Sequence, residues 1–458
     1  MIKLQKKALL SLGLLLTCIN AIAIDFTTSG EGNTYNLEKL SLIERSGVSK
    51  NGDQYVIDGT ITIAGTDSFK IDEGVIVEFC DGAELILQGP ADLRAMNSRT
   101  RLTRHDDISY CYGINVQSPA MIEVANLDFE YVGLRGNTSV GMNVRNCSFT
   151  RHNGNASGAL FLGGSGAVFQ VEGCHFEFCQ KAAIGGAANY FCPVTINNCS
   201  FVKNSQANGN IPQLNLTSAS DITISNCTVE GDSTLNMVGG IAISNFYGYD
   251  GQHVKISGCT ICDNRYGITT LGVMDVRITD NMIINNHFET NPNNGGSGIS
   301  LYDPYMKQRA YIAGNHIEKN LWGITVIGCG YVDLGTLTAW DADADYSPGN
   351  NVFKDNGFEG ALYDLYNNST NPIFAQGNIW NVDIQDEEHI EEVIFHKHDN
   401  EALGEVFFMP AGNPDGIVSP QRHQQSDGTI YHITGLKARA NGALPHGIYI
   451  INGKKVVK

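Results

Sequence analysis

The sequence has few charged side chains and, after its first residues, no long apolar run. Only 17% of the 458 residues are charged, and 30 basic residues stand against 48 acidic ones, for a formal net charge of −18. Binding to phosphate groups requires a basic surface, so this deficit argues against nucleic-acid partners and against anionic membranes. No apolar stretch beyond residue 24 is long enough to cross a bilayer, so we expect no transmembrane segment in the mature chain.

The first residues are the exception and read as a secretory signal. Lysines at positions 3, 6 and 7 precede the apolar run 8–18, and Ala21-Ile22-Ala23 has the small-x-small pattern of a cleavage site. Residues 1–23 are therefore predicted to be removed. Lipoprotein processing at Cys18 is the less favoured alternative, because Thr17 is a poor residue before that cysteine. We expect the mature protein to be secreted, on the cell surface or in the periplasm.

One phrase recurs along the middle of the chain, as in VRNCSF (144–149), INNCSF (196–201) and ISGCTI (256–261). Each copy is a short alternating strand, then Asn, Gly or Asp, then Cys or Asn, then a second alternating strand. The Cys/Asn reference position falls, at intervals of 22 to 36 residues, at Cys147, Cys174, Cys199, Cys227, Cys259, Asn281, Asn315, Asn351 and Asn378. Repeats of this length are typical of solenoids.

Two further registers repeat with the phrase. An asparagine stands five residues after the reference position at Asn204, Asn264, Asn286, Asn320 and Asn356. A small residue followed by an aliphatic one recurs at Gly113-Ile114, Ala183-Ile184, Gly240-Ile241, Gly267-Ile268, Gly298-Ile299 and Gly323-Ile324. Asn and Gly tolerate the left-handed conformation that bends a chain between strands, and repeated bends coil the chain so that equivalent residues stack. The repeats therefore predict an all-β protein, a right-handed parallel β-helix.

The cysteines at the reference position have two interpretations. Exported proteins often contain disulfides, which would join neighbouring coils. Cysteine also behaves as a small buried hydrophobe that fills an inward slot, and the regular column favours free buried thiols.

The chain divides as follows. Residues 24–54 are predicted to form an N-terminal cap, residues 55–410 the β-helix with a C-terminal cap, residues 411–429 a linker, and residues 430–458 a small β element. Within the C-terminal cap, 383–402 has apolar residues at helical spacing, with Ile390, Val393 and Ile394 on one face. We expect a short helix there, followed by a strand within 404–410.

The opening coils, the repeats, GNNVFKDNG (349–357) and IFAQGNIW (373–380) together resemble the pectin-lyase-like right-handed β-helix superfamily. More narrowly, they resemble exported β-helix repeat proteins of Bacteroidetes type, and GIYIINGKKVVK (447–458) is similar to the end of type IX sorting domains, in a shortened form. The superfamily includes polysaccharide lyases, hydrolases, epimerases and adhesins, so the resemblance implies the fold and leaves the activity open. The GHG and NTD motifs of its hydrolases are missing from this sequence.

The best candidate catalytic cluster is YDPYMKQR (302–309). Lys307 and Arg309 share a face if this stretch is extended, so Lys307 is a candidate base for proton abstraction beside a uronate carboxylate that Arg309 would neutralise. Asp303 is the third member, as a candidate metal ligand. The YDPY segment is similar to the DPH motif of uronan C5-epimerases, with Tyr305 in place of the histidine. The alternative is an exposed loop with solvated charges.

Two more features are candidates for binding. Tyr302, Tyr305, Tyr266 and Trp322 are predicted to stack on sugar rings, with Phe246, Tyr247 and Tyr249 in the same side groove; burial under loops is the alternative. Asp341, Asp343 and Asp345 alternate in one loop and form a candidate Ca2+ site, the alternative being a solvated acidic turn. No other cofactor is indicated.

Two hypotheses follow for the function. The favoured one is a non-catalytic exported surface or adhesion-type protein that binds polysaccharide, because no catalytic motif is complete. The second is a polysaccharide lyase or uronan epimerase that uses Lys307 and Arg309. The sequence does not distinguish a monomer from an oligomer.

Overall fold

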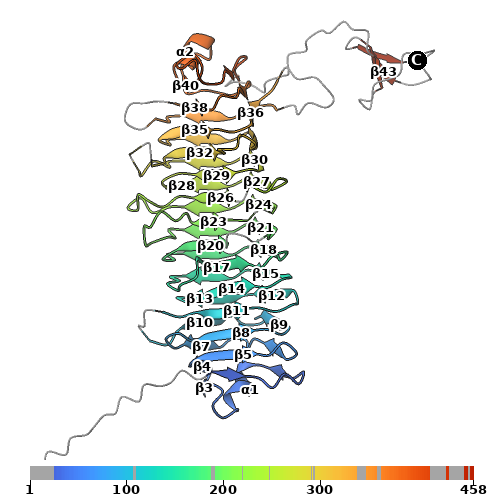
Figure 1. The fold of residues 1–458 in the computed structure, drawn as a ribbon, viewed down its shortest axis with the longest axis vertical. Helices are drawn as coiled ribbons and strands as arrows, with labels where there is room; N and C mark the ends of the chain where they lie inside the picture. The colour runs from blue at the N-terminus through green and yellow to red at the C-terminus, as the bar shows by residue number, and fades with distance from the viewer. Residues whose placement is uncertain are drawn as a thin grey trace, which may run out of the picture.

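The protein is a long coil of short strands that stack into three parallel sheets (Figure 1). The structure, a computed structural model, describes residues 25–106, 110–186, 191–218, 220–246, 248–289, 291, 294–337, 347–357 and 363–412, and the backbone of three strands between 430 and 457. The predicted signal (1–23) and residues 413–429 of the predicted linker lie outside the described residues. Among the described residues, no helix has the length and apolarity to cross a membrane.

Each coil contributes one strand to each sheet, so neighbouring strands in a sheet come from successive coils. The exception is the antiparallel pair of β3 and β4 at the start of sheet C. Sheet A contains β1 (Phe26–Thr27), β5 (Thr60–Ile63), β8 (Glu84–Leu87), β11 (Gly113–Val116), β14 (Gly133–Asn137), β17 (Gly158–Gly163), β20 (Ala182–Gly186), β23 (Leu214–Leu216), β26 (Ile241–Asn245), β29 (Ile268–Gly272), β32 (Ser297–Tyr302), β35 (Trp322–Ile327), β38 (Leu365–Asn368) and β40 (Ile394–Phe395). Sheet B contains β2 (Thr34–Tyr35), β6 (Ser68–Lys70), β9 (Ala91–Arg94), β12 (Ile122–Ala125), β15 (Gly141–Arg145), β18 (Val168–Glu172), β21 (Val194–Asn197), β24 (Ile222–Ser225), β27 (His253–Ser257), β30 (Asp275–Thr279), β33 (Arg309–Ala313), β36 (Tyr331–Gly335), β39 (Ile373–Ala375) and β41 (Val406–Phe407). Sheet C contains β3 (Val48–Asn51), β4 (Gln54–Ile57), β7 (Ile76–Phe79), β10 (Thr100–Arg104), β13 (Leu127–Glu130), β16 (Ser148–Thr150), β19 (His175–Glu177), β22 (Ser200–Val202), β25 (Thr228–Glu230), β28 (Thr260–Cys262), β31 (Met282–Ile284), β34 (His316–Glu318) and β37 (Val352–Lys354). The predicted right-handed parallel β-helix is confirmed.

The interior is built from columns of identical side chains. Alternation directs every second residue of a strand inward, and the parallel register places each inward residue on its counterpart in the next coil. In sheet B, Ile224 pairs with Ile256, which pairs with Ile278. In sheet C, the rings of Phe129, Phe149, Phe176 and Phe201 are stacked 4.6, 4.8 and 5.0 Å apart. These contacts form one continuous apolar core along the molecule.

The turn from sheet B to sheet C is made by a single left-handed residue. Nine such residues, each directly before a reference position, have φ between 51° and 73°: Asn146, Gly173, Asn198, Asn226, Gly258, Asp280, Gly314, Asn350 and Gly377. Asn126, before Leu127, makes the same turn one coil earlier, with φ of 57°. Asn, Asp and Gly tolerate this conformation best, which explains why only these types occupy the position.

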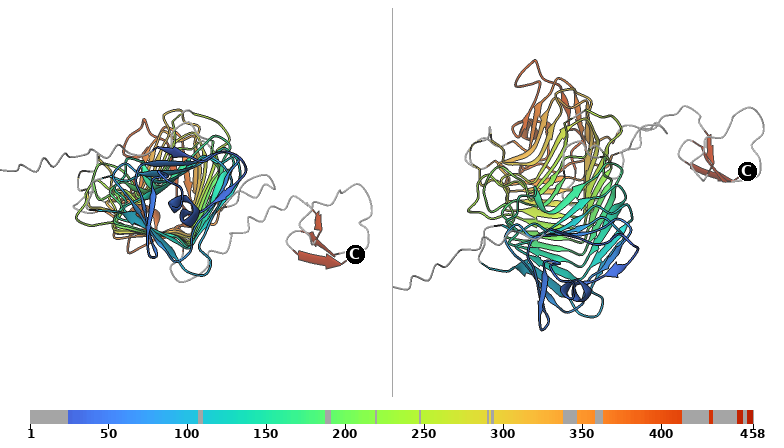
Figure 2. Two further views of the ribbon diagram at one scale, coloured as in Figure 1. Left: turned by 90° about the horizontal axis from the view of Figure 1, so that it is seen from below. Right: turned by 60° about the horizontal axis from the view of Figure 1, so that its bottom comes forward.

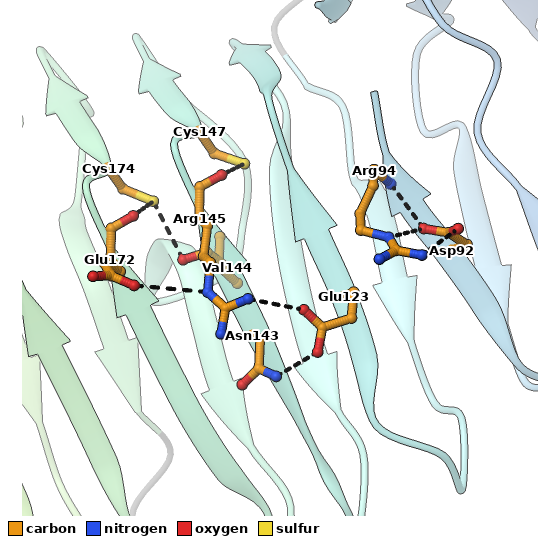
Figure 3. Close-up of polar contacts among 9 residues, drawn as sticks. All are labelled: Asp92, Arg94, Glu123, Asn143, Val144, Arg145, Cys147, Glu172 and Cys174. Carbon is orange, nitrogen blue, oxygen red and sulfur yellow. Dashed lines mark hydrogen bonds and ion pairs between the residues drawn. The ribbon is translucent and has the colours of Figure 1, made fainter. Parts of the chain in front are cut away.

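The reference position forms the expected column. Figure 3 shows Cys147 and Cys174 in neighbouring coils, each with its sulfur near a backbone carbonyl, at 3.3 Å from Arg145 O and 3.4 Å from Glu172 O. Further along, the Cys227 N–H donates to Cys259 Sγ at 3.5 Å. All eleven cysteines of the described residues are free thiols, so the free-thiol interpretation is confirmed for this column.

Asparagine continues the column toward the C-terminus. The Cys259 N–H donates to Asn281 Oδ1 at 2.9 Å, and the side-chain amides then bond in series through Asn315 and Asn351 to Asn378, each at 2.9 Å. The second asparagine register forms a similar series, which ends where Asn356 Nδ2 donates to the buried carboxylate of Asp364 at 3.1 Å. These two amide ladders satisfy polar groups that would otherwise be buried without partners.

Both ends of the coil are covered. Helix α1 (Leu37–Ser41) buries Leu37 and Leu40 and lies across the N-terminal opening, visible from below in Figure 2. At the other end, α2 (Glu387–Glu391) buries Ile390. The short helix expected within 383–402 is present, but Val393 and Ile394 lie beyond its end. The chain after α2 returns to sheet A as β40, where the Asp364 N–H donates to the Val393 carbonyl at 2.8 Å. β41 lies within the strand expected at 404–410.

The C-terminal element is a separate antiparallel sheet of β42 (Ile430–His432), β43 (Ile448–Ile451) and β44 (Lys454–Val457). The small C-terminal β element is thus confirmed. The predicted domain boundaries and the role of this element in sorting stay predictions.

Candidate functional site

The candidate catalytic cluster lies in the loop that leads from β32 of sheet A to β33 of sheet B. Asp303 is fully buried at its start. Its carboxylate accepts hydrogen bonds from the backbone N–H groups of Tyr305 at 3.0 Å and of Lys307 and Gln308 at 2.6 Å. Asp303 therefore holds the loop in shape, and its suggested part in catalysis or metal binding stays a prediction.

Lys307 and Arg309 do emerge on the same side of the chain, because the residue between them points inward. Gln308 is buried and donates through Nε2 to Thr270 Oγ1 and to the Gly272 carbonyl, both at 3.1 Å. The two charged groups then turn to different neighbours. Lys307 Nζ lies 3.7 Å from Asp250 Oδ1, and the Arg309 guanidinium lies over the Tyr331 ring, 5.7 Å from its centroid.

Exposed aromatic side chains gather in the loops around this segment. Tyr302 and Tyr305 are 37% and 61% exposed, and Phe191, Phe246 and Tyr249 of the preceding coils are also exposed. The rings of Phe191 and Tyr249 meet edge to face at 4.7 Å, and the Tyr305 ring lies 4.0 Å from the point that a Cβ on Gly248 would occupy. We call these five residues the aromatic strip. It follows the ends of the sheet A strands over several coils.

Beside the strip, the outer face of sheet A is lined by small side chains. The strand register places one outward residue of each coil in a line: Gly185, Asn215, Ala242, Thr269, Ser300 and Thr325. We call this the small-residue row. Bulky rings bound it at both ends, since Phe161 pairs with Gly185 and Thr325 pairs with Tyr366. The row brings the backbone of sheet A close to the surface of the molecule.

The other two predicted sugar-stacking residues lie at the opposite ends of the sheet A strands. Trp322 contacts Tyr363 and Tyr366, with ring centroids 5.7 and 4.7 Å apart, and is half-buried in that cluster. Tyr266 packs its ring on Gly239, where no Cβ would fit, and burial raises its pKa to about 12. Tyr266 is therefore separated from the aromatic strip by the width of sheet A.

The structure adds nothing on the candidate calcium loop. Asp341, Asp343 and Asp345 lie outside the described residues, as does Tyr247. Within the part of the chain that is described, no group of three or more His, Cys, Asp or Glu side chains is placed to hold a metal ion.

Sequence reasoning missed the small-residue row and Phe191. A signal for the row was present, because most of its members directly follow the small–aliphatic register, as in Gly267-Ile268-Thr269 and Gly298-Ile299-Ser300. Phe191 lies between repeat copies, at a position that has no counterpart of its own type in neighbouring coils.

The sheets, the turns and the ladders define a right-handed parallel β-helix protein in which sheet A carries the small-residue row and the aromatic strip. No family model matches the chain, and no curated protein matches it. Solved structures that it is similar to include those of the periplasmic alginate epimerase AlgG. One structure of that enzyme is 12% identical, covers 82% of this chain and 83% of its own, and has a TM-score of 0.34. A point mutant is 11% identical, covers 83% of both chains and has a TM-score of 0.39. A likeness of this size carries no argument about the site.

Proposed function

We propose that this protein is an exported, non-catalytic polysaccharide-binding protein that holds its ligand along the outer face of sheet A. The observation that carries the proposal is the aromatic strip, in which exposed rings lie beside the small-residue row. Flat aromatic rings offer large apolar area at low conformational cost, which suits stacking on the faces of sugar rings.

The small-residue row supplies the complementary part of the surface. Hydroxyl and amide groups of Asn215, Thr269 and Ser300 provide hydrogen-bond donors and acceptors, and their short side chains let a ligand approach the sheet closely. The members of the row are uncharged. We therefore expect binding that changes little with salt concentration, in contrast to binding dominated by ion pairs.

The test is affinity electrophoresis and calorimetry of the mature protein against a panel of neutral and uronate polysaccharides. Tyr305→Ala and Tyr249→Ala should each weaken binding to the best ligand roughly 10-fold, from the ~1–1.5 kcal/mol of one aromatic contact. Phe407→Ala is the matched control, because Phe407 is a 47% exposed aromatic residue of sheet B. Urea unfolding of each variant verifies the fold.

Two results would contradict the proposal. One is the absence of measurable binding to any member of a broad panel. The other is binding that Phe407→Ala weakens as much as the two tyrosine substitutions do.

The second candidate is a polysaccharide lyase or uronan epimerase, favoured by the placement of Lys307 and Arg309 on one side of the chain. In this mechanism Lys307 removes the proton next to a uronate carboxylate and Arg309 neutralises the carboxylate. The ion pair of Lys307 with Asp250 must then open when substrate binds. Incubation with uronate polysaccharides tests it: unsaturated products absorb in the ultraviolet, and an epimer appears in proton NMR spectra. Either signal, lost in Lys307→Ala, would replace the non-catalytic proposal.

A further inference from the structure

The small-residue row has a definite length along sheet A. It begins at Gly185 on β20 and ends at Thr325 on β35, and Figure 1 shows the six sheet A strands from β20 to β35 one above another. The five strand-to-strand steps, at ~4.8 Å each, make the row about 24 Å long. Asn215, Thr269 and Ser300 are partly exposed, so a ligand that lies along sheet A can contact the row.

Large side chains continue the same outward line beyond both ends of the row. Arg135 and Phe161 precede it on β14 and β17. Tyr366 and Phe395 follow it on β38 and β40. In β17 the residues on either side of Phe161 are buried, whereas Phe161 itself is partly exposed. Its ring therefore points out of the sheet and stands higher than the short side chains of the row.

The end of the row at β38 is closed by a cluster of four rings. The Tyr366 ring is stacked on Phe395, with centroids 4.7 Å apart and planes 13° apart, and the Trp322 ring meets it edge to face at 4.7 Å. The Tyr363 ring contacts those of Trp322 and Phe395, at 5.7 and 5.4 Å. Because each ring packs against at least two others, the Tyr366 ring is held in place at the end of the row.

The aromatic strip covers the same part of the molecule as the row. Its first member, Phe191, lies between β20 and β21, and its last, Tyr305, lies between β32 and β33. Between them, Ala242 points outward from β26 but is only 9% exposed, so the side chains around it rise above this part of the row. Two separate sets of residues therefore give the candidate binding face similar limits.

We propose that Phe161 and Tyr366 set the length of the sugar chain that this face accepts, so that the site holds a linear segment of about 24 Å. The proposal rests on the proposed function. Within the row, each added sugar exchanges water for contacts with short side chains and with the aromatic strip. A sugar that passes Phe161 or Tyr366 is lifted away from the sheet by the ring, so it adds little to the affinity.

The experiment measures dissociation constants by calorimetry as a function of chain length. The probes are neutral cello-oligosaccharides, oligogalacturonates, and size-defined linear fragments of the polysaccharide that binds best in the panel. For the unchanged protein, the affinity should increase with chain length up to ~24 Å and stay constant for longer chains.

Two variants should change the length at which the affinity becomes constant. Asn215→Tyr places a ring on β23 and leaves a row of four strands from Ala242 to Thr325, so this length should decrease to ~14 Å. The double variant Tyr366→Thr/Phe395→Thr continues the row over β38 and β40, so the length should increase to ~34 Å. Because Asn215 points outward, its replacement leaves the core unchanged, and Asn215→Tyr remains decisive if the double variant does not fold.

Thr223→Tyr is the matched control. Thr223 points outward from β24 on sheet B, in the same coil as Asn215, so this variant adds the same ring on another face. The length at which the affinity becomes constant should not change. The urea midpoint of each variant shows whether the fold is kept.

The outcomes separate the two proposals. If neither the polysaccharides nor the oligosaccharides bind, the proposed function fails. If oligosaccharides bind but the affinity of the unchanged protein keeps increasing well beyond ~24 Å, this inference is overturned while the proposed function stands. The same holds if the affinity for Asn215→Tyr becomes constant at the same length as for the unchanged protein, or if Thr223→Tyr shifts that length equally.

Discussion

Asn320 lies inside the second amide ladder and has no exposed surface. Its Oδ1 accepts from the Asn286 N–H at 3.1 Å and from Asn286 Nδ2 at 2.9 Å, while its Nδ2 donates to the Ile283 carbonyl at 3.0 Å and to Asn356 Oδ1 at 3.1 Å. In Asn320→Ala all four bonds are lost, and the buried Asn286 N–H has no other acceptor. One orphaned N–H costs about 1–3 kcal/mol and each of the three further lost bonds about 1 kcal/mol, so we expect a loss of roughly 4–6 kcal/mol.

Urea unfolding followed by far-UV circular dichroism measures this loss, and amide hydrogen exchange at Asn286 reports it locally. Asn368→Ala is the matched control, because Asn368 is an exposed asparagine at the end of β38. The control should change stability by less than about 0.5 kcal/mol, as is usual at surface positions. If Asn320→Ala and Asn368→Ala unfold at the same urea concentration, the ladder does not stabilise the fold and this reasoning is refuted.

Three more predictions concern ionisable groups. Burial raises the pKa of Asp364 from 3.8 to about 7, so between these pH values the folded state retains a proton that the unfolded state has released. The free energy of unfolding should therefore fall as the pH rises through this interval. Asp364→Asn should flatten the dependence of the urea midpoint on pH. Hydrogen bonds from His316 and Lys319 lower the pKa of Glu318 to about 2. Glu318 therefore stabilises the fold fully above pH 4.5, and this contribution is lost as the pH falls toward 2. If Glu318→Gln loses stability in acid as steeply as the unchanged protein, this prediction is contradicted. The hydrogen bond with Cys174, together with burial, raises the pKa of Cys199 to about 12. The thiols of the cysteine column should therefore react with a thiol reagent only after denaturation. Rapid reaction of these thiols in the native protein would contradict the prediction.

The fold could be predicted from the sequence because each repeat marks its turn and its inward positions by residue type. Asn146, Asn198 and Asn226 mark left-handed turns by residue type alone, and the residue after each marks a column. The second left-handed turn of each coil could not be predicted in this way. It falls on Tyr131, Arg151 and Phe178 among others, with φ of 65°, 54° and 53°, and these types do not favour that conformation.

The arrangement of the candidate site could be predicted only where the alternation of a single extended segment determines it. Alternation alone placed Lys307 and Arg309 on the same side of the chain. The burial of Asp303 was not predictable, because it depends on the loop closing over the carboxylate through three backbone N–H groups. The aromatic strip depends on how loops of unequal length align across coils, which no periodicity encodes.

The packing around His152 was equally hidden. His152 occupies the position that asparagine holds in later coils, five residues after Cys147, and nothing in its immediate sequence distinguishes it. Its setting depends on Gly154, two residues further along, and on Gly133 of the preceding coil. Contacts between residues of different coils become visible only in the folded structure.

The one-residue turn between sheets B and C has a consequence for how this scaffold tolerates change. Adding a single residue there would shift the alternation of the next strand and exchange its inner and outer faces. The loops on either side of sheet A already differ in length from coil to coil, as between β26 and β27 and between β29 and β30. Foreign peptides can therefore be grafted beside sheet A without disturbing the register, so new recognition surfaces can be exchanged on a core that stays the same.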